Sequence, residues 1–147
     1  MRLRANRLAL LLVASLATGC SGDPQADYCD TVEDHQVELT DIAASEDAGA
    51  LFDALPVYDD LADEAPEDIA DDWAAVIEPL RALEKTLSEA GVDPSSYAAD
   101  EPPADLDDAD REDIEAAARG VGSEATVTAM AAVEQHALDV CGTPLSR

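Results

Sequence analysis

Apolar residues between positions 69 and 90 recur at alternating intervals of four and three residues. This spacing places them on one face of an α-helix. Pro66 suits the first turn of such a helix, Gly91 suits its C-terminal end, and Pro79 is expected to bend it. The segment therefore predicts a long amphipathic helix with a buried face of Ile69, Trp73, Val76, Leu80, Leu83, Leu87 and Ala90.

Three further segments show helical periodicity. One covers about residues 26–44, and a second covers about 46–64, where Pro56 is expected to kink the helix or split it in two. A third restarts near Asp108, is interrupted at Gly120 and Gly122, and continues from the N-cap Ser123 to about residue 141. Short connections between amphipathic helices favour an all-α fold, an antiparallel bundle of four main helices. Its expected buried positions include Tyr28, Val32, His35, Leu39, Ile42, Leu51, Leu55, Tyr58, Ala62, Val127, Met130, Val133, Ala137 and Val140.

The first 20 residues have the pattern of a secretory signal peptide. Arg2, Arg4 and Arg7 precede an apolar run from Leu8 to Ala17, and small residues follow it. A run of this length is about half of what a membrane-spanning helix needs. We therefore expect residues 1–19 to be a targeting segment that is removed.

The residues before Cys20 refine this expectation. The stretch 16–20, Leu-Ala-Thr-Gly-Cys, resembles the lipobox of bacterial lipoproteins, with Ala17 where that family prefers leucine. The resemblance implies that Cys20 carries a lipid and that residues 20–26 form a polar tether to the membrane. The whole chain is similar to small helical lipoproteins of actinobacteria, which implies no particular activity. The alternative is ordinary cleavage after Ala17 or Gly19, which would give a secreted protein.

Lipidation of Cys20 would leave Cys29 and Cys141, of the three cysteines, as a pair. An extracytoplasmic compartment is oxidising, so we expect these two to form a disulfide that joins the start of the first helix to the end of the last. Aromatic residues make up only 3% of the chain. A thin aliphatic core of this kind in a single domain, residues 27–147, benefits from a covalent link. Two unpaired buried thiols are the alternative, and neither cysteine has neighbours at metal-ligand spacing.

The chain is strongly acidic. It has 34 acidic and 8 basic residues, and its formal charge changes from −26 to −29 when Arg2, Arg4 and Arg7 are removed. This charge excludes nucleic acids and anionic lipid surfaces as direct ligands. Basic partners, cations or solubility alone remain as explanations.

Two groups of residues are candidate sites. The irregular acidic segment 91–107 is expected to lie exposed at the end of the bundle far from the membrane, with Tyr97, Asp100 and Glu101 as a contact loop. His35 and His136 lie at similar distances from Cys29 and Cys141, so they are weak candidates for a divalent-metal site. Hydrogen-bonded histidines at the edge of the core are the simpler interpretation.

Other sites are not supported by the sequence. The stretch 105–113 resembles a calcium loop in composition, but counting from Asp108 gives Asp113 where an EF-hand needs glycine and Arg119 where it needs glutamate. No nucleophile elbow, phosphate loop or H-E-x-x-H motif is present, and we expect neither a catalytic residue nor a cofactor.

The sequence therefore predicts a non-catalytic, lipid-anchored extracytoplasmic protein that acts as an interaction or binding module for a basic protein partner. A cation- or metal-binding envelope protein is the alternative, and an envelope hydrolase is a third possibility.

Overall fold

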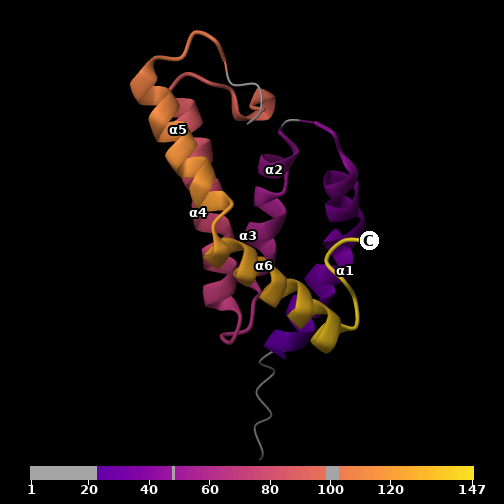
Figure 1. The fold of residues 1–147 in the computed structure, drawn as a ribbon. Helices are drawn as coiled ribbons and strands as arrows, with labels where there is room; N and C mark the ends of the chain where they lie inside the picture. The colour runs from indigo at the N-terminus through magenta and orange to yellow at the C-terminus, as the bar shows by residue number, and fades with distance from the viewer. Residues whose placement is uncertain (1–22, 48, 99–102) are drawn as a thin grey trace, which may run out of the picture.

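The computed structural model describes residues 23–47, 49–98 and 103–147, all of whose regular elements are helical (Figure 1). The signal segment 1–19, Cys20, Asp100 and Glu101 lie outside these residues. The elements are α1 (Pro24–Ala44), α2 (Ala50–Asp53), α3 (Leu55–Asp63), α4 (Ala70–Glu89), the 3₁₀ turn η1 (Pro94–Ser96), α5 (Asp108–Val121), α6 (Glu124–His136) and the π-helical turn η2 (Ala137–Cys141).

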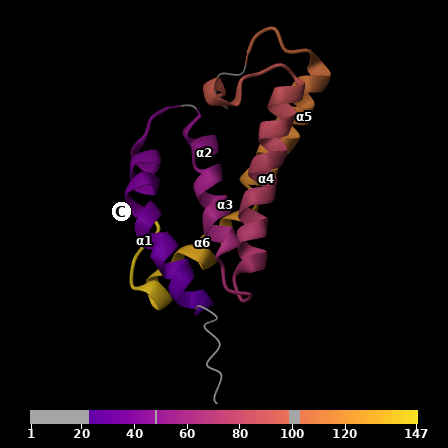
Figure 2. The ribbon, with the colours of Figure 1, turned by 180° about the vertical axis from the view of Figure 1, so that it is seen from behind.

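The helical segments run alternately in opposite directions, as Figures 1 and 2 show from the two sides. Helix α1 is followed by α2 and α3 in the reverse direction, α4 runs back alongside α3, and α5 and α6 return. Helix α4 contacts α3, α5 and α6, while α1 contacts α3 and η2. The predicted antiparallel all-α bundle is confirmed, and the described parts of the segment 91–107, residues 91–98 and 103–107, lie at the end opposite to the start of α1.

Local sequence signals explain most helix ends. The side chain of Asp23 accepts a hydrogen bond from the Gln25 backbone N–H and caps α1. Ser123 caps α6 in the same way, accepting from Thr126 N–H. Pro56 lies in the first turn of α3, and the predicted second helix is indeed split there, between α2 and α3.

The start of α4 differs from the prediction. Residues 66–69 form a turn in which Ile69 N–H donates to Pro66 O (N···O 3.1 Å), and the helix begins only at Ala70. Pro66 is therefore not in the first helical turn, because the chain needs this turn to reverse after α3. Downstream, α4 continues through Pro79 to Glu89, and Gly91, the predicted C-terminal stop, has a positive φ of 73°.

The core combines the predicted α4 face with residues from every other long helix. Trp73, Tyr28, Leu61, Leu87, Val32 and Val133 are its largest fully buried side chains. In the last helical segment the predicted face was wrong at two positions, since Val127 of α6 and Val140 of η2 are 60% and 37% exposed. Smaller residues are buried instead: Thr126 and Ala129 on α6, which packs closely against α4, and Ala137 in η2.

Cys29 and Cys141 form the predicted disulfide, with their Cα atoms 5.2 Å apart. It ties the first turns of α1 to η2 at the end of the bundle where the described chain begins (Figure 1). The tail that follows η2 also lies on α1. Gln36 Nε2 donates to Pro144 O (2.6 Å), Arg147 N–H donates to Thr40 Oγ1 (3.0 Å), and Leu145 is buried.

Substitution of Gly49 should disturb packing enough to change the measured stability. A Cβ at this position would lie 2.6 Å from Ser95 Cα and 2.7 Å from Ser95 O, so the loop before α2 and the segment around η1 could not keep their contact. We expect Gly49→Ala to lower the free energy of unfolding by about 1–3 kcal/mol in urea denaturation. Gly120→Ala is the matched control, because its Cβ would lie 3.9 Å from Pro79 Cβ; it should instead raise stability, by up to about 1 kcal/mol. Equal effects of the two substitutions would contradict the close contact.

Candidate functional site

The predicted contact loop is not arranged as expected. Tyr97 is only 8% exposed, and burial raises the pKa of its hydroxyl. The expectation that Tyr97 is exposed was therefore wrong. The chain turns back at η1, which contacts α2 and α4, and this brings the ring of Tyr97 into the core.

The two histidines occupy separate surroundings. His35 lies between α1 and α3, with Nδ1 3.2 Å from Glu38 Oε2 and Nε2 3.4 Å from Asp60 Oδ2. His136 packs edge-on against Tyr28, with ring centroids 5.8 Å apart, and its Nδ1 lies 3.9 Å from Asp68 Oδ2. Within residues 23–47, 49–98 and 103–147, no group of three or more His, Cys, Asp or Glu side chains is arranged to hold a metal ion.

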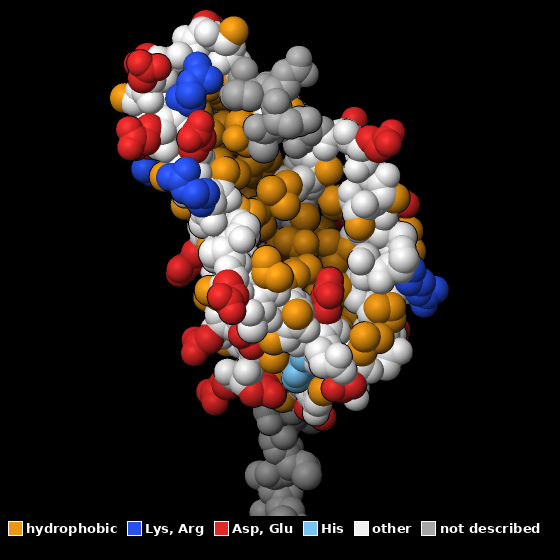
Figure 3. Space-filling model, in the orientation of Figure 1, with side chains coloured by type: hydrophobic (Ala, Val, Ile, Leu, Met, Phe, Trp, Pro, Cys, Tyr) orange, Lys and Arg blue, Asp and Glu red, His pale blue; other side chains and the backbone are white. Residues whose placement is uncertain are grey.

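An open apolar groove lies between α6 on one side and α1, α2 and α3 on the other. Figure 3 shows apolar side chains gathered in a hollow near the middle of one face of the molecule. The groove has a volume of about 290 Å³. Its lining residues are Leu39, Ile42, Ala43, Ala50, Leu51, Ala54, Tyr58, Met130, Glu134, Leu145 and Ser146.

The groove follows from the way the helices are joined. Helix α6 crosses from α4 to the start of α1, where the disulfide fixes η2, and so it diverges from the far end of α1 (Figures 1 and 2). Leu39, Ala54 and Leu145 are buried and belong to the hydrophobic core. The short side chains of Ala43 and Ala50 leave the space above them open. The C-terminal tail, held on α1 by its two hydrogen bonds, closes one side.

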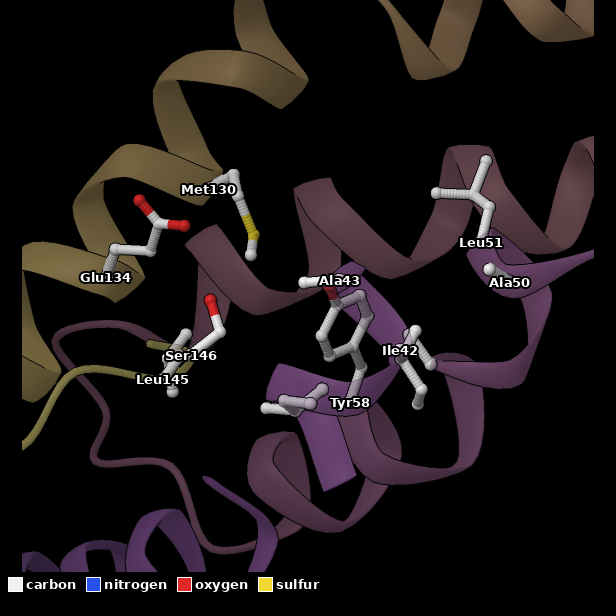
Figure 4. Close-up of a pocket in the computed structure, with 11 residues that line it drawn as sticks. Ile42, Ala43, Ala50, Leu51, Tyr58, Met130, Glu134, Leu145 and Ser146 are labelled. Atoms are coloured by element: carbon white, nitrogen blue, oxygen red, sulfur yellow. The ribbon is translucent and has the colours of Figure 1, made fainter. Parts of the chain in front are cut away.

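Polar groups lie toward one end of this groove. Figure 4 shows Glu134 and Ser146 on one side of the view and Ile42, Ala50 and Leu51 on the other. The ring of Tyr58 and the side chain of Met130 lie between these two groups. Among the described residues that line the groove, Glu134 is the only charged one. Burial and the charge of Glu134 both raise the pKa of the Tyr58 hydroxyl, so the field of this carboxylate reaches the groove.

This arrangement can bind aliphatic groups and hold a cation beside them. Leu51 forms part of the groove wall, and its large apolar side chain is 43% exposed. The groove was not predicted from the sequence, because helical periodicity assigns Leu51, Tyr58 and Met130 to buried helix faces. A partial signal was present: Glu134 follows Met130 and Val133 on the apolar side of α6.

No helix in the described part of the chain is both long enough and apolar enough to cross a membrane. The chain matches no family model, no curated protein is significantly similar to it in sequence, and no solved structure is significantly similar to it in fold.

Proposed function

We propose that the chain is a non-catalytic binding module of the cell envelope, held at the outer face of the membrane by a lipid on Cys20. The signal-like segment 1–19 and the lipobox-like residues before Cys20 support the anchor. The Cys29–Cys141 disulfide supports an oxidising, extracytoplasmic compartment. Cys29 lies nine residues after Cys20 in the sequence, so a lipid there would hold the disulfide-linked end of the bundle near the membrane.

The apolar groove is the observation that carries the binding role. Small soluble domains seldom leave a hollow lined by aliphatic side chains open to solvent unless something binds there. Eight of its eleven lining residues have neither a charge nor a hydroxyl group, and a ninth is the aromatic Tyr58. The whole chain carries a formal charge of −26. An open apolar hollow on such a surface supports ligand binding better than it supports a solubilising role alone.

Binding of a neutral apolar dye tests this role. The full chain carrying Cys20→Ser, purified without detergent that would fill the groove, is titrated with Nile red. Ala43 is exposed and lines the groove, so Ala43→Trp should fill it without disturbing the core. We expect the dye to bind the parent chain and to bind Ala43→Trp about tenfold or more weakly.

Ala44→Trp is the matched control, since Ala44 is the next residue of α1, is exposed and does not line the groove. It should bind the dye as the parent does. Absent dye binding, or an equal loss in the two tryptophan variants, would contradict the groove as the binding site.

A further inference from the structure

We infer that the groove binds a short segment of a basic protein, whose aliphatic side chains lie along the apolar wall while one lysine or arginine meets Glu134. This inference rests on the proposed binding function and specifies its partner. It follows from the size of the groove, from its one carboxylate and from the charge of the protein around it.

The size of the groove suits a few side chains. Its volume of about 290 Å³ is just below the range of small-molecule sites, roughly 300–1,000 Å³. A hollow of this size is too small to enclose a large cofactor, but it can hold two or three aliphatic side chains. It is also open along one side (Figure 3), so a chain whose backbone remains outside could insert them.

Glu134 favours a cation on the ligand, because its exposed side chain lines the groove. Its carboxylate stands on an apolar wall, and no described residue forms an ion pair or a side-chain hydrogen bond with it. A ligand that covered the groove without a cation would take water from this carboxylate and leave the charge uncompensated, which is costly. Lysine or arginine would compensate it, with the hydroxyl of Ser146 on the same side of the groove as a further acceptor.

The overall charge favours a basic partner over two other occupants. Anionic lipid is repelled by a protein with a formal charge of −26. A second copy of the chain carries the same charge, so its approach would be opposed as well. A basic protein would be attracted at long range and would also satisfy Glu134 on contact.

Calorimetry with designed peptides tests the inference on the detergent-free full chain carrying Cys20→Ser. The probe is a short blocked peptide of leucine and alanine with one central lysine. Two companions replace the lysine with glutamate or the leucines with serine. We expect the leucine–lysine peptide to bind about tenfold or more tightly than either companion, because each companion loses one of the two kinds of contact.

Substitutions in the protein locate the effect. Glu134→Gln should bring the lysine and glutamate peptides to nearly equal affinity. Glu112→Gln removes the same charge from an exposed position on α5 outside the groove, so it should preserve the preference. Ala43→Trp should weaken the leucine–lysine peptide, and Ala44→Trp should not.

Several outcomes would overturn the inference about the partner. The groove would remain a binding site in these cases if the dye titration gives the expected result. One is equal affinity for the lysine and glutamate peptides in the parent chain. Another is a preference for lysine that survives Glu134→Gln. A third is binding of n-octylamine as tight as that of the peptide, which would identify a small amphiphile as the ligand. Self-association that competes with dye binding would identify a second copy.

Discussion

Loss of the Cys29–Cys141 disulfide should lower the free energy of unfolding by about 4–5 kcal/mol. The bond joins residues separated by 112 positions, and closing so long a loop removes many conformations from the unfolded chain. A domain of this size typically has a total stability of about 5–15 kcal/mol. The chain without the disulfide is therefore expected to be marginally stable.

The measurement is guanidinium denaturation of Cys20→Ser protein with and without Cys29→Ser and Cys141→Ser. Cys20→Ser removes the third cysteine, so Cys29–Cys141 is the one disulfide that the reductant can break. Adding dithiothreitol to the parent should reproduce the double substitution, while adding it to the double variant should change nothing. An unchanged denaturation midpoint after reduction would contradict the stabilising role of the disulfide.

Loss of the disulfide should cause local unfolding first at the junction between α1 and η2. Apart from the disulfide, this junction depends on packing and on the two hydrogen bonds that hold the tail on α1. Amide hydrogens in η2 and the first turns of α1 should therefore exchange faster than those of α4, which contacts α2, α3, α5 and α6. The groove should be affected too, because Leu145 and Ser146 line it.

Replacement of Cys20, the proposed lipid attachment residue, should release nearly all of the protein from the membrane. We expect Cys20→Ser to move nearly all of the protein from the membrane fraction to the soluble extracytoplasmic fraction. The strongly acidic composition of the chain opposes adhesion to anionic lipid.

Fractionation of cells that express the two forms, followed by carbonate washing of the membranes, checks this expectation. Ser21→Ala is the matched control, since it alters the neighbouring tether residue and keeps the cysteine. It should remain with the membrane. Retention of Cys20→Ser in washed membranes would show that another feature holds the protein there.

The bundle could be predicted because its signals are local. The four-and-three spacing from Ile69 onward defines one helix face, Pro56 forces a break, and Ser123 supplies an N-cap whose hydrogen bond the structure contains. The disulfide was predicted from the cysteine count, with Cys20 assigned to a lipid, and the up-and-down order of the helices is consistent with it. Each of these inferences needs only a few neighbouring residues, the number of cysteines or the order of the helices.

The features that depend on tertiary packing could not be predicted in this way. Helix α4 starts at Ala70 because residues 66–69 make the reversal after α3, and periodicity does not show this. Tyr97 is buried because η1 contacts α2, which depends on the absence of a side chain at Gly49. Val127 is exposed because α6 packs closely on α4 and buries the smaller Thr126 and Ala129 instead.

The groove has the same origin. It exists because α6 diverges from α1, so Tyr58 and Met130 line an open hollow although their spacing assigns them to buried faces. Tyr58 also packs against Trp73, with ring centroids 5.5 Å apart, so one edge of its ring belongs to the core. Periodicity reports the side of a helix that turns inward, but it does not report how far a neighbouring helix lies from that side.

The mass of the mature N-terminal peptide tests the proposed anchored binding module most directly. Protein is extracted from the native envelope, digested, and its first peptide is measured by mass spectrometry. We predict a chain that begins at Cys20 and carries a diacylglyceryl group on its sulfur. A chain that begins at Thr18, or one with an unmodified Cys20, would contradict the anchor.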